Sequence, residues 1–351
     1  MYLRLIPLII FATLATAPLL AQTAPSKTAT TNVETQSALP PALAPAGNVS
    51  TQRENSENWS ALPLAESGLP VEFSGAVLLG RYETPQFTRE LLQAEWRLGD
   101  PIDLYVVRPH GVTNPPVILY LYNYTSDTDR FRDDGWCKRA TENGFAAVGF
   151  VSALSGQRFH SPRPMKQWFV SELQEALASS THDVQMVLNY LETRGDLDMK
   201  NVGMFGQESG GAIAVLAAAA DTRITALDVI NPWGDWPDWL KESKQIPDGE
   251  RATYVTPEFL HKVVNLDPIS YLPTLHLHAL RVQQVKDNLI TPPITRDKIA
   301  AAVLYPQQLV QYKDVSELAA TWHTTGLSGW LRAQMRSASV AASKLEPSPV
   351  E

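Results

Sequence analysis

A short turn between a strand-like run and a helix-like run could carry chemistry in this sequence. Residues 202–210 read VGMFGQESG, and an alanine-rich stretch follows. Small residues four positions apart let a helix pack tightly on the strand before it, and the residue midway between them is held in a sharp turn with its side chain presented outward. With Gly206 and Gly210 in those two places, the presented residue is Glu208.

A second register of the same turn would present Ser209. The flanking positions would then be Gln207 and Gly211. Gln207 is large for such a close contact, so the glycine spacing favours Glu208, although a shift by one residue would expose the Ser209 hydroxyl instead. The two registers imply different chemistry, because a serine needs a base to remove its proton, whereas a glutamate is ionised at neutral pH.

Alternating strand and helix patterns surround this turn and must position it. The continuous apolar runs PVILYLY and FAAVGFV indicate strands that are covered on both faces. Strands that alternate with helices predict an α/β protein with a mostly parallel central sheet and helices on both faces. The expected elements are a hairpin over 95–108, strands over 116–122, 145–151, 201–205, 224–230, 280–285 and 308–312, and helices over 134–143, 164–193, 209–220 and 326–336.

The two ends of the chain have compositions unlike the middle. Arg4 followed by the apolar run 5–20 and the small residue Ala21 predicts a signal peptide over 1–21, and hence a secreted or periplasmic protein without a stable membrane span after cleavage. An uncleaved anchor is the alternative, but the run is short beside the roughly 20 apolar residues of a spanning helix. Residues 22–70 and 337–351 are rich in Ala, Thr, Ser and Pro, which predicts a disordered linker and tail around a domain over 71–336.

Charge and cysteine content narrow the choice of partners. The net charge of −8 argues against a nucleic-acid partner. Cys137 is the only cysteine, so an intramolecular disulfide and a cysteine-based zinc site are both impossible. Spacings typical of metal ligands, such as two histidines four apart beside a glutamate, are not found. We therefore expect no metal and no cofactor, and a small molecule as the partner.

Together these segments resemble the α/β-hydrolase superfamily, in its esterase- and peptidase-like branch. The resemblance covers roughly 89–336 and rests on GQESG, PVILYLYNYTSD, VKDNLITPP and WHTTGLSGWL. It implies a nucleophile elbow in which Glu208 stands where the family has serine. In that family the acid and then the histidine follow the nucleophile along the chain. The matching positions are Asp287 and His323, and Asp235 in NPWGDW is an alternative acid.

The resemblance also implies a site for an oxyanion at the loop after strand 116–122. The family often has His-Gly there, whereas this chain has Tyr122-Asn123-Tyr124. The Asn123 amide or the Tyr124 hydroxyl could donate a hydrogen bond to an oxyanion beside Gln207. In the alternative interpretation, this loop only covers the sheet.

Three tryptophans lie where the family often carries a lid. Trp233, Trp236 and Trp239 recur every three residues between the strands 224–230 and 280–285. They could form a short lid or cap over an apolar or sugar-like substrate. Alternatively, a short helix packs them into the core.

A glutamate at the elbow changes the expected chemistry. A carboxylate is a weak nucleophile, yet it can attack a carbon that bears a good leaving group and form an ester intermediate. If Glu208 paired with His323, the imidazole would stay charged and could not act as a general base. Three hypotheses follow. The protein is a secreted hydrolase acting on an ester or related acyl substrate through Ser209 or Glu208, a catalytically silent protein that binds a ligand, or, less favoured, a hydrolase with a carboxylate nucleophile.

Overall fold

The computed structural model describes residues 57–72, 75–123, 128–152, 169–326 and 328–336. The chain divides into two units, Met1–Arg53 and Glu54–Glu351, and all described residues belong to the second. The predicted signal peptide, most of the predicted linker and the predicted tail lie outside the described residues.

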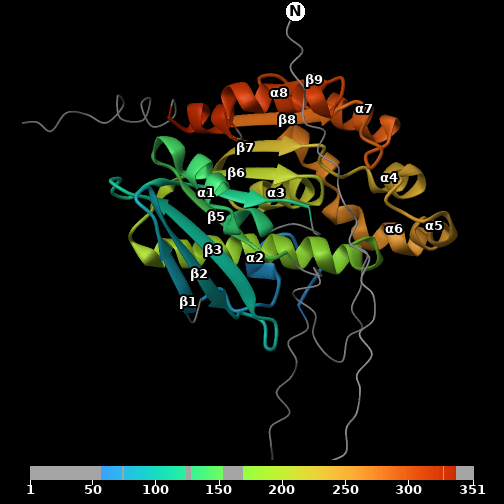
Figure 1. Ribbon diagram of the computed structural model, residues 1–351. Helices are drawn as coiled ribbons and strands as arrows, with labels where there is room; N and C mark the ends of the chain where they lie inside the picture. The colour runs from blue at the N-terminus through green and yellow to red at the C-terminus, as the bar shows by residue number, and fades with distance from the viewer. Residues whose placement is uncertain (1–56, 73–74, 124–127, 153–168, 327, 337–351) are drawn as a thin grey trace, which may run out of the picture. The chain divides into compact units, whose positions relative to one another are not determined.

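A nine-stranded sheet forms the centre of the second unit (Figure 1). The strand order is β1-β2-β3-β5-β4-β6-β7-β8-β9. Neighbours from β1 to β5 pair antiparallel, and all pairs from β5 to β9 are parallel. The expected mostly parallel sheet is therefore confirmed. The strands are β1 (Ala76–Glu83), β2 (Phe87–Ala94), β3 (Ile102–Pro109), β4 (Pro116–Leu121), β5 (Ala146–Phe150), β6 (Asp198–Gln207), β7 (Ile224–Ile230), β8 (Ala279–Val285) and β9 (Gln308–Tyr312).

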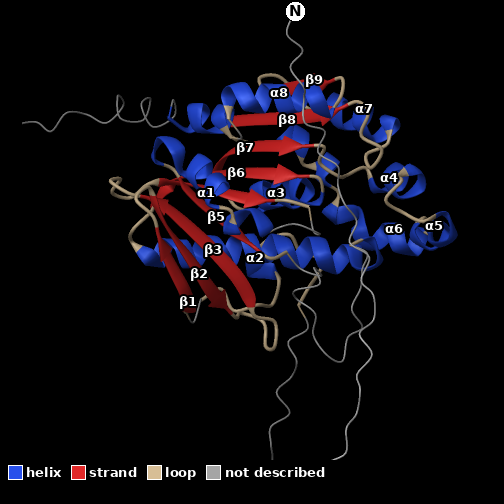
Figure 2. Ribbon diagram, viewed as in Figure 1, coloured by secondary structure: helices blue, strands red, loops and turns tan. Residues whose placement is uncertain are grey.

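Helices cover both faces of this sheet (Figure 2). One buried cluster joins the sheet to α2, α3, α4 and α7, and a second joins its other face to α1, α8 and a last helix over 329–336. The α-helices are α1 (Asp134–Thr141), α2 (Leu173–Arg194), α3 (Ser209–Ala220), α4 (Trp236–Glu242), α5 (Asp248–Tyr254), α6 (Pro257–Val263), α7 (Pro293–Ala302) and α8 (Val315–Thr325). Short 3₁₀ turns, including η1 (Leu64–Glu66) and η3 (Glu142–Gly144), connect them.

The central strands are buried as their composition predicts. All residues of β5, and all of β4 after Pro116, are inaccessible or nearly so. Since both faces of these strands meet helices, an unbroken apolar run is favoured over an alternating one. By contrast β1 is exposed along nearly its whole length, because it is the edge strand.

Two expected elements differ from the structure. The first arm of the predicted hairpin lies upstream of the prediction, in β2, and residues 95–101 form the connection to β3. The single predicted helix over 326–336 is preceded by α8, which contains His323. The sequence-based expectation places no helix over VSELAATWHTT. In the structure Asp314 caps the first turn of α8 by accepting a hydrogen bond from the Glu317 N–H at 3.0 Å.

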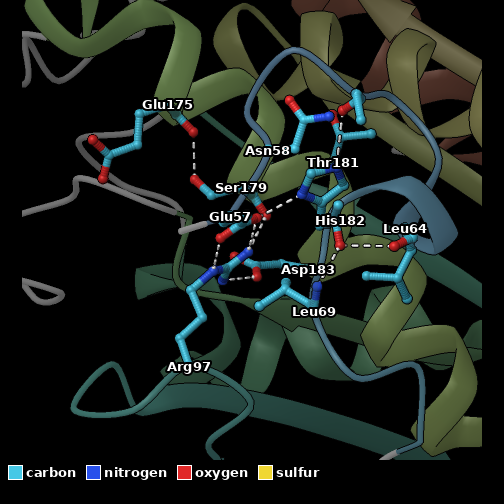
Figure 3. Close-up of polar contacts among 12 residues, drawn as sticks. Glu57, Asn58, Leu64, Leu69, Arg97, Glu175, Ser179, Thr181, His182 and Asp183 are labelled. Carbon is cyan, nitrogen blue, oxygen red and sulfur yellow. Dashed lines mark hydrogen bonds and ion pairs between the residues drawn. The ribbon is translucent and has the colours of Figure 1, made fainter. Parts of the chain in front are cut away.

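The folded domain begins earlier than expected. The composition of residues 22–70 predicts a linker, yet residues 57–70 pack along α2 (Figure 3). Leu64 is buried, and its N–H donates to the Gln185 side chain at 2.9 Å. The segment is ordered by a few specific contacts with α2, and its composition alone does not reveal such contacts. Within the described ranges, no helix has the length and apolar character needed to cross a membrane.

Candidate functional site

Glu208 lies at the tip of the turn between β6 and α3. Its backbone has φ 53° and ψ −115°, a strained conformation for a residue with a side chain. A Cβ on Gly206 would lie 2.7 Å from the Gly210 carbonyl oxygen, and one on Gly210 only 2.3 Å from the Leu121 carbonyl oxygen. Both positions therefore require glycine, and that requirement sets the register of the turn.

Backbone hydrogen bonds hold the strained residue from three directions. The Glu208 N–H donates to the Ile230 carbonyl at 2.9 Å, at the end of β7. The Glu208 carbonyl accepts from the N–H groups of Ala212 at 3.0 Å and Trp233 at 3.3 Å. The turn is thus fixed by β7, by the first turn of α3 and by the segment after β7. Ser209 is the first residue of α3 and is only 1% exposed.

Two amides face the Glu208 carboxyl group. Asn123, just after β4, donates from Nδ2 to Glu208 Oε2 at 3.5 Å. Asn288, in the turn after β8, also hydrogen-bonds the Glu208 side chain. The Asn288 Oδ1 accepts from the N–H groups of Ile290 at 2.8 Å and Thr291 at 3.0 Å, which leaves its NH₂ group to donate to Glu208. Strands β4, β6 and β8 therefore each deliver one polar side chain to the same edge of the sheet.

Burial raises the pKa of Glu208, and the hydrogen bonds from Asn123 and Asn288 offset only part of this effect. No charged partner takes part in the shift, since amides are neutral. The raised pKa increases the fraction of protonated carboxyl group near neutral pH. Such a group can both donate and accept hydrogen bonds.

The structure does not bring His323 to Glu208. His323 lies exposed in the last turn of α8 and lines a cavity with Glu142 and Asn143, which directly precede β5. That is the amino edge of the parallel strands, whereas Glu208 stands at their carboxyl edge. The loop between β9 and α8, where the resemblance expects the histidine, contains Lys313 and Asp314.

Asp287 lies in the exposed turn that follows β8. It is adjacent to Asn288, the residue that reaches Glu208, so the expected position of the acid is occupied by an amide one residue later. The sequence gives no sign that Asn288, rather than the adjacent Asp287, faces Glu208, because a lone asparagine in a turn has no pattern of its own. The alternative acid, Asp235, lies directly before α4 and forms a salt bridge with Lys298 Nζ at 2.9 Å, which ties the start of α4 to α7.

The expected oxyanion residues separate into different environments. The Tyr122 side chain is buried, accepts a hydrogen bond from Trp136 Nε1 at 3.0 Å and packs beneath the Arg130 guanidinium at 4.2 Å. It is thus part of the core and does not line the elbow. Gln207 is half-buried, and its Oε1 has no hydrogen-bond partner among the described residues. Tyr124 lies outside the described residues.

The tryptophans of the expected lid fill the core. Trp233, Trp236 and Trp239 are all essentially inaccessible, with ring centroids 4.6 Å apart for the first and last and 5.7 Å apart for Trp236 and Trp239. Trp236 Nε1 donates to the Leu266 carbonyl at 2.9 Å. A helical insertion does lie between β7 and β8, where α4, α5 and α6 extend beyond the arrowheads of β6, β7 and β8 (Figure 1). Its tryptophans anchor it to the sheet.

Within the part of the chain that the structure describes, no group of three or more His, Cys, Asp or Glu side chains could hold a metal ion. Cys137 is buried in α1 as a free thiol.

Comparisons with known proteins show which solved structures have a similar architecture. No family model matches the chain, and no curated protein matches it. Among solved structures, it is similar to an acetyl xylan esterase from Paenibacillus sp. R4, with TM-score 0.58 and 15% identity over 71% of this chain and 87% of that one. It is also similar to acetyl xylan esterase 1 from Thermoanaerobacterium sp. JW/SL YS485, with TM-score 0.58 and 14% identity over 71% and 87%.

A third similar structure is an S-formylglutathione hydrolase from Agrobacterium tumefaciens, with TM-score 0.54 and 14% identity over 74% of this chain and 98% of that one. At these identities the likeness establishes the fold alone. The chain has the α/β-hydrolase fold, as the elbow and the strand order together indicate.

Proposed function

We propose that this protein binds a small hydroxylated molecule at the elbow and does not cleave esters there. The observation that carries the proposal is the carboxyl group of Glu208 at the strained tip, hydrogen-bonded by the amides of Asn123 and Asn288. The site keeps the backbone of a nucleophile elbow and replaces its reactive side chains with groups that recognise polar ligands.

Acyl transfer by serine has little support in this arrangement. A serine nucleophile needs a base within about 2.6–3.2 Å of its hydroxyl. Ser209 is buried at the start of α3, and His323 stands at the other edge of the sheet. Asparagine amides cannot accept a proton near neutral pH, so Asn123 and Asn288 cannot replace the histidine as a base.

The same groups suit a sugar-like ligand. A hydroxyl group both donates and accepts, and a half-buried carboxyl flanked by amides offers both kinds of partner. Two of the similar structures are named acetyl xylan esterases, which supports a carbohydrate as the ligand. We therefore propose a short oligosaccharide, bound through its hydroxyls to Glu208 and Asn288.

A second candidate is a hydrolase with a carboxylate nucleophile, favoured by the position of Glu208 at the tip itself. The longer glutamate side chain and its hydrogen bonds to two amides both argue against attack, because the amides hold the carboxyl oxygens that would have to reach the substrate.

Binding and turnover should be measured on the purified chain and on Glu208→Gln, Ser209→Ala and Glu208→Ser. We expect no hydrolysis of p-nitrophenyl acetate by the parent. We expect calorimetric binding of xylo-oligosaccharides that weakens about tenfold in Glu208→Gln, through loss of one hydrogen bond between the carboxyl group and the ligand. Glu258→Gln, at an exposed position of α6, is the matched control and should bind as the parent does.

Esterase activity that disappears in Ser209→Ala would refute the proposal and restore a serine hydrolase. Activity on epoxides or alkyl halides that disappears in Glu208→Gln would favour the carboxylate nucleophile instead. Ester turnover appearing only in Glu208→Ser would support a disabled elbow.

A further inference from the structure

A cavity of about 450 Å³ lies at the opposite edge of the sheet from Glu208. It is open to solvent and is lined by the end of α1, the end of α8 and the helix over 329–336. Figure 1 shows these helix ends on the side of the sheet away from the arrowheads of β6, β7 and β8. The lining residues that matter here are Arg139, Glu142, Trp322, His323, Arg332 and Arg336.

The lining of this cavity is positively charged, whereas the whole chain has a negative net charge. Three guanidinium groups line it against the single carboxylate of Glu142, in a protein with net charge −8. Arg332 and Arg336 form no ion pair with any described residue, and Arg139 approaches only Asp133, at 4.0 Å, with both side chains largely exposed. Among the described residues, acids therefore neutralise little of this positive charge.

Arg332 is the buried, fixed cation of this site. It is only 4% exposed, and its Nη1 donates to the carbonyl oxygens of Arg139 at 3.0 Å and Ala140 at 3.5 Å, which fixes the plane of the guanidinium. Its Nε has no hydrogen-bond partner among the described residues. Its Nη2 lies beside Gly326, another residue of the cavity lining, 3.4 Å from where a Cβ would stand. Nε and Nη2 together form the edge of a guanidinium group that can bind two oxygens of one oxyanion.

We propose that this cavity binds a small organic phosphate. A guanidinium fork matches two oxygens of a phosphate group, and an unpaired buried donor is costly unless a ligand satisfies it. The excess of guanidinium groups suits a dianion. The volume exceeds that of an inorganic ion and falls in the range of small-molecule sites, so the phosphate carries an organic group, which would lie against Trp322.

This site is independent of the elbow. Glu208 stands at the carboxyl edge of the parallel strands, and the cavity lies at their amino edge, before β5. His323, which the sequence suggested as a catalytic base, belongs to the cavity.

Calorimetric titration of the full chain in phosphate-free, low-salt buffer tests the proposal, with glycerol 3-phosphate, inorganic phosphate, succinate and acetate as probes. We expect glycerol 3-phosphate to bind tightest and acetate not at all. Arg336→Gln, at an exposed position, should weaken binding about tenfold through loss of a charge-assisted hydrogen bond. Arg332→Lys should weaken it at least as much, since lysine keeps the charge and loses the fork.

Lys262→Gln is the matched control, because it removes one exposed positive charge from α6, away from the cavity. It should leave the affinity unchanged. If Arg332→Lys fails to fold, as judged by thermal melting, Arg336→Gln decides alone. Affinity for glycerol 3-phosphate that is absent in the parent, equal to that for acetate, or unchanged in Arg336→Gln would overturn the proposal.

Discussion

Replacing Glu57 with glutamine should destabilise the protein at neutral pH through a buried network of charges (Figure 3). The Glu57 carboxylate accepts two hydrogen bonds from Arg97, at 2.5 Å from Nε and 2.8 Å from Nη2. Arg97 also pairs with Asp183 of α2, and Asp183 accepts from Trp96 Nε1 at 2.8 Å. The segment before η1, the β2–β3 connection and α2 are therefore joined by one set of ionic contacts.

His182 completes this network. Its Nδ1 lies 2.5 Å from Glu57 Oε1, and its Nε2 lies 2.9 Å from the Ala61 carbonyl oxygen. A carbonyl oxygen only accepts, so His182 Nε2 donates to Ala61, and Nδ1 is the ring atom that contacts the Glu57 carboxylate. Removing the Glu57 charge would leave the fully buried His182 ring facing a neutral amide.

The magnitude follows from the pKa of Glu57. Burial by itself would raise that pKa, but hydrogen bonds from Arg97 and His182, with their charges, lower it from 4.5 to about 2. At 1.36 kcal/mol for each pKa unit, the ionised carboxylate contributes about 3 kcal/mol to the free energy of unfolding. Because the folded pKa is the lower one, this contribution is complete above pH 4.5 and is lost as the pH falls from 4.5 towards 2.

Urea unfolding of the parent and Glu57→Gln at several pH values between 7 and 2 is the direct assay. The difference in unfolding free energy should be about 3 kcal/mol at pH 7 and shrink steadily below pH 4.5. Glu66→Gln, at an exposed position of the same segment, should match the parent throughout. A Glu57→Gln protein as stable as the parent at pH 7, or a difference that does not change with pH, would refute the reasoning.

Three further predictions concern the site and the core. Gly210→Ala should lower stability by about 3 kcal/mol in thermal unfolding, since the new Cβ meets backbone at 2.3 Å, whereas Gly249→Ala, with nothing within 4 Å, should not. Asn288→Asp should raise the pKa of Glu208 further, because a second carboxylate would face it. NMR titration of the Glu208 carboxyl carbon should then show a midpoint at higher pH than in the parent, and an unchanged midpoint would contradict the contact. Trp239→Ala should cost about 4 kcal/mol in urea unfolding, as for other large core truncations, and a cost below 1 kcal/mol would indicate a loosely packed insertion.

Local patterns predicted much of the fold. The bounds of α3, β7 and β9 agree with the sequence-based expectations, and the unbroken apolar runs mark β4 and β5 as buried strands. These features depend on residues that are close in the sequence, because the hydrophobic period of a helix or strand is set within that one element. The exposed edge strand β1 left no such pattern, because an edge strand with little burial has no alternation to reveal it.

The position of His323 shows where sequence reasoning failed. Interpreted as a loop, residues 315–323 would have left the histidine beside the end of β9. As the helix α8, they rise about 1.5 Å per residue and carry it roughly 12 Å back along the sheet. Order along the chain therefore agreed with the hydrolase pattern while position in space did not.

The glycine spacing in the sequence favours Glu208 over Ser209 as the residue presented at the elbow. The close backbone contacts of Gly206 and Gly210 and the positive φ of Glu208 agree with that register. The groups that face this carboxyl group could not be predicted from the sequence. Asn123 follows β4 and Asn288 follows β8, and they meet Glu208 because parallel strands on either side of β6 end at one edge of the sheet. Contacts between segments so far apart in the chain depend on strand order and register, which no local pattern encodes.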